Sequence, residues 1–148
     1  MRKYIPFILI FIMLILILGS SAISGPVSYG SSEVVARFVK ELMAFMGDNN
    51  YCVTTIDMII RKLAHFSEYM LLTVLLSIGF LNITKRKWFP LLISGFIGFT
   101  VSLLDEGFVQ AFTSRNSSLF DVLVDCSGIM AGLLVIFLYL TLGVKMKK

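Results

Sequence analysis

The chain is dominated by four apolar runs separated by short polar segments. The runs cover residues 4–23, 56–83, 89–112 and 120–144. An α-helix rises about 1.5 Å per residue, so about 20 apolar residues cross the roughly 30 Å hydrocarbon core of a bilayer. Hydrophobic residues make up 57% of the chain and its mean hydropathy is +0.91, which excludes an ordinary soluble domain. The pattern predicts an all-α membrane protein with four transmembrane helices in a single domain, residues 1–148.

One further helix is predicted between the first two runs, at residues 33–46. Apolar positions such as Val35 and Phe38 recur there at helical spacing, and charged residues cover the other side. The segment is too short and too charged to span a membrane, so we expect an amphipathic helix on the outer interface. It either packs over the helix bundle or rests on lipid headgroups, and a lid over an outward site is the alternative role.

Two helix starts have recognisable residues. Thr54 followed by Asp57 resembles a capping box, with Asp in place of the usual Glu, and predicts the start of the second spanning helix. Pro90 suits the first turn of the third.

The basic residues predict the orientation. Eight of them lie at the chain ends and between the second and third runs: Arg2, Lys3, Lys85, Arg86, Lys87, Lys145, Lys147 and Lys148. Four crossings place all of these on one side, and the positive-inside rule makes that side the cytoplasm. All nine carboxylates then lie outside or in the outer half of the membrane. The net charge of +4 is therefore an orientation signal, and no nucleic-acid partner is expected.

The first run has a second interpretation. A basic start, an apolar core and the small residues 20–22 also resemble a signal peptide with a cleavage site. The apolar core is at the upper length limit for such a peptide, so we favour a retained helix. Cys52 and Cys126 match no metal or redox spacing and are expected to be unpaired thiols.

Ionisable residues of three runs are predicted to meet in one layer of the membrane. Measured from the inner end of each helix, Glu68 lies roughly 22 Å up, Asp105 and Glu106 roughly 24–26 Å, and Asp125 roughly 27 Å. His65 lies one turn from Glu68, and Asp121 one turn from Asp125. Charge at membrane depth is costly and usually marks a protein interior or a wet cavity with a function.

The faces of the helices are consistent with such a site. The second run carries one face made of Lys62, His65, Phe66 and Tyr69, with Arg61 and Glu68 on the adjacent stripe. The third run repeats Ser102, Glu106 and Gln110 at a spacing of four, with Asp105 offset to one side. The fourth run carries a stripe of Asp121, Asp125, Gly128 and Gly132, whose GxxxG part permits close helix approach. We therefore expect an outward-facing polar pocket above a closely packed bundle.

Five carboxylates in one layer favour a shared proton or a bound divalent cation. Arg115, in the outer loop, could clamp an aspartate or an anionic headgroup through two hydrogen bonds. Each residue also has a structural explanation. A single His near a helix end is often interfacial, Asp121 could cap the fourth helix, and Lys62 could extend to the headgroups.

These residues resemble the VanZ-like family of bacterial membrane proteins. Residues 62–69 (KLAHFSEY) are similar to the family's K-x-x-H-F-x-E-Y segment, and residues 105–110 (DEGFVQ) to its D-E-x-x-Q segment. A third family segment, R-x-x-S-x-x-D-x-x-x-(N/D)-x-x-G-x-x-x-G, is similar to the positions Arg115, Ser118, Asp121, Asp125, Gly128 and Gly132. The resemblance implies a multi-pass protein of the bacterial cytoplasmic membrane. The family's namesake is associated with resistance to the glycopeptide teicoplanin.

Three hypotheses follow. The first is a protein that binds or modifies a cell-envelope component, either a membrane lipid or a cell-wall precursor, through Lys62, His65, Tyr69, Glu106, Gln110, Arg115, Asp121 and Asp125. The second is an intramembrane enzyme acting on a lipid by acid–base or metal-assisted chemistry, with catalytic candidates His65, Glu68, Asp105 and Glu106. The third, a transporter or proton pathway, is the weakest, because the polar layer does not continue toward the cytoplasm.

Overall fold

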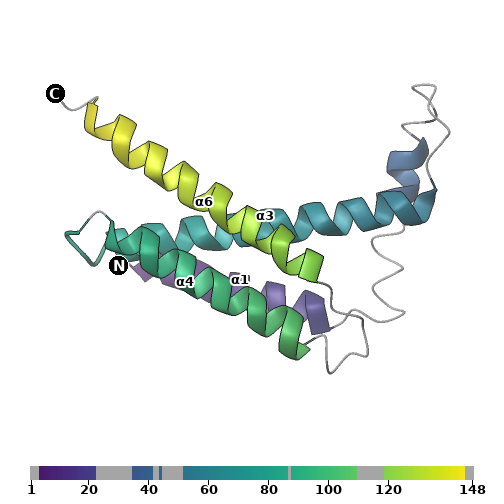
Figure 1. The fold of residues 1–148 in the computed structure, drawn as a ribbon, viewed down its shortest axis with the longest axis horizontal. Coiled ribbons are helices and arrows are strands. Elements are labelled where there is room, and N and C mark those ends of the chain that lie inside the picture. The colour runs from purple at the N-terminus through teal and green to yellow at the C-terminus, as the bar shows by residue number, and fades with distance from the viewer. Residues whose placement is uncertain are drawn as a thin grey trace.

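The protein is an assembly of helices. The structure, a computed structural model, describes residues 4–22, 35–41, 44, 52–86, 88–109 and 119–145. The four apolar runs form α1 (Ile5–Ala22), α3 (Val53–Leu81), α4 (Phe89–Leu104) and α6 (Leu119–Lys145), and α4 continues as the π-helix η2 (Asp105–Val109) (Figure 1). Within these ranges there is no β-strand, so the predicted all-α class is confirmed.

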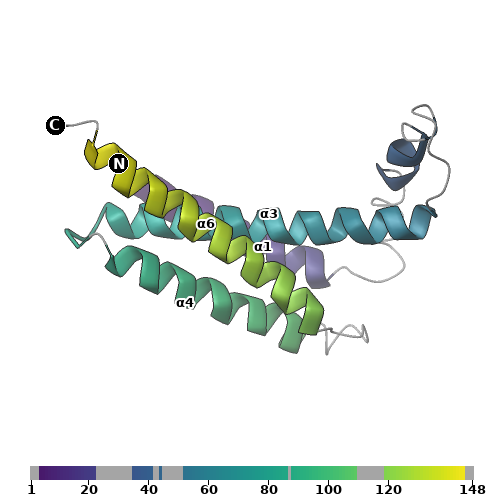
Figure 2. The ribbon, with the colours of Figure 1, turned by 45° about the horizontal axis from the view of Figure 1, so that its top comes forward.

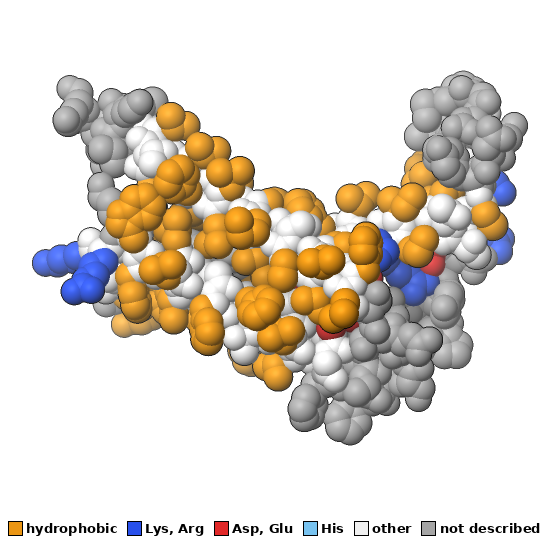
Figure 3. Space-filling model, in the orientation of Figure 1, with side chains coloured by type: hydrophobic (Ala, Val, Ile, Leu, Met, Phe, Trp, Pro, Cys, Tyr) orange, Lys and Arg blue, Asp and Glu red, His pale blue; other side chains and the backbone are white. Residues whose placement is uncertain are grey.

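Among the residues that the structure describes, three stretches of helix are long and apolar enough to cross a membrane. They are Val53–Leu81, Phe89–Gly107 and Leu119–Leu142. The apolar stretch of α1, Ile5–Gly19, is shorter. Large hydrophobic side chains remain exposed along the helices, and they cover much of the face seen in Figure 3. Such a surface is typical of a protein whose exterior faces lipid.

The predicted capping box is wrong, whereas the predicted role of Pro90 is confirmed. The N-cap of α3 is Cys52, which makes no side-chain capping bond, and Thr54 instead donates a hydrogen bond to Cys52 Sγ at 3.3 Å. Asp57 is buried and pairs with Arg61 one turn further along. This cationic partner at i+4 replaces the backbone N–H groups that a cap would bind. Pro90 stands in the first turn of α4.

The closest helix packing is between α3 and α6, at the GxxxG stripe. A β-carbon built on Gly128 would lie 2.3 Å from the carbonyl oxygen of Phe66, and one on Gly132 would lie 2.7 Å from that of Met70. Only glycine lets the two backbones approach this closely. The prediction that this stripe of α6 faces the bundle is therefore confirmed.

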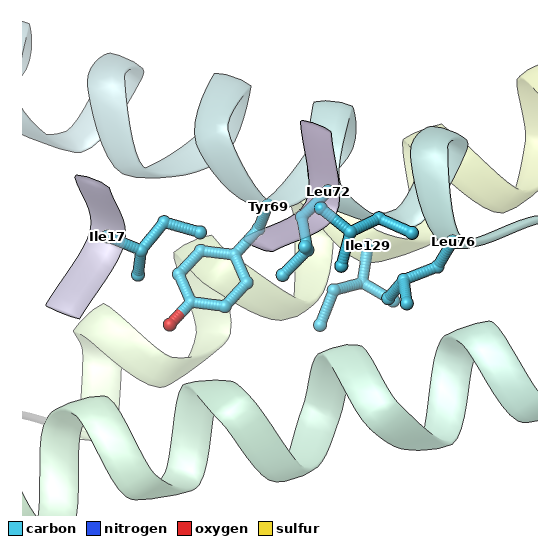
Figure 4. Close-up of a cluster of buried hydrophobic side chains, with 6 residues drawn as sticks. Ile17, Tyr69, Leu72, Leu76 and Ile129 are labelled. Atoms are coloured by element: carbon cyan, nitrogen blue, oxygen red, sulfur yellow. The ribbon is translucent and has the colours of Figure 1, made fainter. Parts of the chain in front are cut away.

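The core contains side chains of α1, α3 and α6: Ile10, Ile17, Tyr69, Leu72, Leu76 and Ile129. In Figure 4 the ring of Tyr69 lies between Ile17 and Leu72, and its hydroxyl points away from Leu72, Leu76 and Ile129. Tyr69 thus belongs to the core by its ring and to a polar site by its oxygen.

Residues 35–41, part of the predicted amphipathic helix, are helical. They lie beside the N-terminal end of α3, apart from α4 and α6 (Figures 1 and 2). Ala36 is buried, but Val35 and Phe38 are exposed. The apolar face therefore does not cover the bundle through these two side chains. The other residues of the predicted apolar face, Leu42, Phe45 and Met46, lie outside the described residues.

Candidate functional site

Four ionisable side chains from three helical segments meet inside the bundle. His65 of α3, Asp105 and Glu106 of η2, and Asp125 of α6 each offer one ligand-type atom, and these atoms all lie within 4.8 Å of one another. The three carboxylates are buried, with residue exposures of 0% for Asp105, 3% for Glu106 and 0% for Asp125. His65 is partly exposed. We call these four residues the carboxylate–histidine cluster.

The predicted face of α3 meets α6. Lys62 Nζ lies 2.8 Å from Asp121 Oδ1 and 4.3 Å from the centre of the Phe120 ring. One turn along, His65 Nδ1 lies 3.7 Å from Asp125 Oδ1. The shared face of Lys62 and His65 is therefore confirmed, and each of these side chains meets one aspartate of the α6 stripe. Tyr69 bonds to Asp105 of η2 instead.

The end of α4 delivers two consecutive carboxylates to the same place. In an α-helix neighbouring side chains point about 100° apart, so the sequence placed Asp105 to one side of Glu106. The chain instead changes to a π-helix at Asp105, and both side chains are buried. Single π-turns of this kind occur frequently at functional sites.

Two hydroxyl groups orient the carboxylates. Tyr69 donates a hydrogen bond to Asp105 Oδ2 at 3.2 Å, and Ser102 donates one to Asp125 Oδ2 at 2.9 Å. The second oxygen of Asp125, Oδ1, is buried and accepts no hydrogen bond from any described residue. Both bonds are buried, where an oriented polar group is held more firmly than in water.

The cluster is smaller than the predicted five-carboxylate layer. Glu68 is half-buried on the adjacent stripe of α3 and is not part of the cluster. Asp121 lies one turn from Asp125 and pairs with Lys62 instead. Gln110 and Arg115 lie outside the described residues, so their predicted roles stay predictions.

Two of the structural explanations are corrected as well. Asp121 is the third residue of α6, which begins at Leu119, so it is not the N-cap. Lys62 is half-buried against Asp121 and Phe120, so its ammonium group pairs within the protein.

Buried hydroxyl groups continue along α3 and α4. Fully buried hydroxyl side chains among the described residues include Thr73, Ser77, Ser94 and Ser102. Ser77 Oγ and Ser94 Oγ have no hydrogen-bond partner among the described residues. Tyr69, Thr73 and Ser77 form one stripe with a spacing of four, as do Ser94, Gly98 and Ser102. These buried groups are neutral hydroxyls, in contrast to the ionisable groups of the cluster.

Comparison with known proteins gives one finding. Residues 6–140 match the family described as VanZ/LLP1. No curated protein and no solved structure matches the chain. The match covers most of the sequence, including every residue of the carboxylate–histidine cluster. The protein therefore belongs to the VanZ/LLP1 family.

Proposed function

We propose that this protein binds a component of the bacterial cell envelope at the carboxylate–histidine cluster and thereby contributes to resistance against teicoplanin-type glycopeptides. The observation that carries the proposal is the convergence of His65, Asp105, Glu106 and Asp125 within 4.8 Å inside an otherwise lipid-facing bundle. Ionisable groups are expensive in such surroundings and are kept where they act. Membership in the VanZ/LLP1 family supports the link to the envelope.

The proposed topology has four transmembrane helices and cytoplasmic termini in the bacterial cytoplasmic membrane. The fourth span is α1, whose 18 residues extend about 27 Å. Its Ile17 is completely buried, while Phe11 on another side is exposed. Such a helix has one side for the bundle and one for lipid. Residues 35–41 then lie on the outer interface, and the cluster lies in the outer third of the membrane.

Labelling of Cys52 tests this orientation. In a Cys126→Ser background, we expect a membrane-impermeant maleimide to label exposed Cys52 in intact cells. The hydrogen bond from Thr54 lowers the pKa of the Cys52 thiol, so more thiolate is present at neutral pH and labelling is faster than in Thr54→Ala. Lowering the pH through that pKa should slow the reaction.

The control places the only cysteine on the other side. In a Cys52→Ser, Cys126→Ser, Arg86→Cys variant, labelling should require permeabilised cells, because Arg86 is exposed in the loop between α3 and α4. Labelling of the Arg86→Cys variant, but not of Cys52, in intact cells would reverse the topology.

The proposed ligand is anionic, as a lipid phosphate or a cell-wall carboxylate is. The half-buried ammonium group of Lys62 lies one turn from His65, which can also carry a positive charge. Together with Arg115, these cations would hold the anion, because hydrogen bonds between charged groups are stronger than those between neutral groups. Glu106, Asp121 and Asp125 would shape the base of the site, with Tyr69 and Gln110 beside them.

A susceptibility assay tests the proposal. In a strain whose teicoplanin resistance depends on this protein, His65→Ala, Asp125→Asn and Arg115→Ala should lower the inhibitory concentration to that of a strain lacking it. Asp57→Asn is the matched control, because Asp57 pairs with Arg61 outside the cluster. Immunoblots of membranes must show equal amounts of each variant. Unchanged resistance in His65→Ala and Asp125→Asn would sink the proposal.

A second candidate, an intramembrane enzyme acting on a lipid, is favoured by the orienting bonds at the cluster. An imidazole beside carboxylates that are fixed by Tyr69 and Ser102 resembles a site built for proton transfer. His65 would be the general acid or base, with Asp105 or Glu106 as its partner. Glu68 would act only from the adjacent stripe.

Mass spectrometry separates the two candidates. Purified protein incubated with envelope lipids should yield a product under the enzyme hypothesis, and Glu106→Gln should not. Binding of those lipids without any product would favour the binding protein.

A further inference from the structure

We propose that the carboxylate–histidine cluster is a binding site for a divalent transition-metal cation, with Mn²⁺ as the best match. The ligand-type atoms of the four residues lie within 4.8 Å of one another. Mn²⁺ has bonds of about 2.2 Å, between those of Mg²⁺ and Ca²⁺, so two ligands on opposite sides of it are about 4.4 Å apart and side-chain shifts of a few tenths of an ångström suffice. The cluster therefore encloses the space of one coordinated ion without rearrangement of the helices.

Asp125 provides an independent indication. Its Oδ1 atom is buried, points into the cluster and accepts no hydrogen bond from any described residue. It lies 3.7 Å from His65 Nδ1, which is too long for a hydrogen bond. Two ligands that each lie about 2.2 Å from one ion are 3.7 Å apart when the angle between their bonds is about 115°. The pair thus has the spacing of two atoms that share an ion.

Further polar groups behave as the outer shell of a metal site. Ligating carboxylates are commonly held by hydrogen bonds from neighbouring side chains, and these partners tune the affinity. Tyr69 holds Asp105 in this way and Ser102 holds Asp125. A divalent cation would also neutralise two of the three carboxylate charges in a buried place, where uncompensated charge is costly.

The donor set narrows the choice of metal. Three carboxylates suit Mg²⁺, Ca²⁺ and Mn²⁺, whereas an imidazole suits transition metals. Mn²⁺ accepts both donor types. The inference goes beyond the proposed function, because metal binding requires no envelope ligand.

The test measures metal on the purified full-length protein. After EDTA treatment and dialysis in detergent, the protein is incubated with Mn²⁺, desalted and analysed for metal content, and the EPR signal of free Mn²⁺ is titrated. We expect stoichiometric Mn²⁺ on the wild type. Asp125→Asn and Glu106→Gln should weaken binding by more than the 10–100-fold that loss of an outer-shell partner costs, and Ser102→Ala by about 10–100-fold.

Asp57→Asn makes the same chemical change outside the cluster and should retain the metal. If Asp125→Asn fails to fold, as judged by gel filtration, His65→Gln replaces it, because His65 is partly exposed. Stoichiometric Zn²⁺ that is lost in the same variants would support the site and assign another metal. Wild type without bound metal, or Asp125→Asn that binds as well as wild type, would overturn the inference. Neither result depends on the resistance assay, so the two proposals fail separately.

Discussion

Gly128→Ala is expected to destabilise the protein by about 3 kcal/mol or more, at the upper end of what overpacking costs. The added methyl group would lie 2.3 Å from the carbonyl oxygen of Phe66 and 3.2 Å from the amide nitrogen of Met70. Both are backbone atoms of α3, so no side chain can rotate to make room. The helices would have to separate, which would also pull Asp125 away from His65. Thermal unfolding of the purified protein in detergent measures the effect.

Gly19→Ala is the matched control, since nothing lies within 4 Å of its added methyl group. This substitution should stabilise helix α1 slightly, because glycine inside a helix lowers its stability by roughly 0.5–1 kcal/mol relative to alanine. A Gly128→Ala protein that unfolds at the wild-type temperature would show that α3 and α6 do not approach as described. Gly128→Leu should prevent folding altogether.

Tyr69→Phe is expected to abolish or severely reduce function while leaving the fold intact. The substitution keeps the buried ring but removes the hydroxyl that donates to Asp105 Oδ2 at 3.2 Å. Loss of one buried hydrogen bond to a charged group costs roughly 1.5–3 kcal/mol of stability. At a metal site, the loss of a side chain that orients a metal ligand typically lowers metal affinity or activity 10–100-fold. Teicoplanin susceptibility and Mn²⁺ affinity are the two readouts.

Leu76→Val separates stability from orientation. Leu76 lies in the same core on the same helix, and its shortening should cost about 1 kcal/mol without touching a carboxylate. If Tyr69→Phe and Leu76→Val impair resistance equally, the hydroxyl of Tyr69 has no special role. Full resistance in Leu76→Val beside sensitivity in Tyr69→Phe is the expected pattern.

The helices could be predicted closely because hydrophobic length determines them. The predicted run 120–144 became Leu119–Lys145, and 89–112 became α4 with η2 as far as the structure describes it. The shared face of Lys62 and His65 followed from helical spacing in the same way. Helical periodicity predicts side-chain directions only in a regular α-helix, and these predictions hold in the regular parts of this chain.

The structure differs from the predictions where local backbone geometry or a neighbouring helix determines the position of a side chain. The spacing of four between Asp57 and Arg61 allows an ion pair, but the spacing of three between Thr54 and Asp57 equally suits a cap, and the sequence does not choose between them. Glu68 lies on the stripe of α3 beside the face of His65 and is not among the four residues of the cluster, and a depth estimate alone does not distinguish the two stripes. The burial of Ser77 and Ser94 depends on which sides of α3 and α4 meet, which emerges only when the bundle is assembled.

The π-turn at the end of α4 has a consequence for insertions and deletions. A π-turn holds one residue more than an α-turn over the same rise, so η2 behaves as an α-helix with a residue inserted between Asp105 and Val109. Deleting exposed Gly107 would restore the α-helical repeat and rotate the residues that follow it by about 100° relative to Asp105 and Glu106. Chains of this family that carry both acids but lack this extra residue should therefore direct the residues after the acids to another face. The length of this short segment thus decides which later residues can share a face with the two acids.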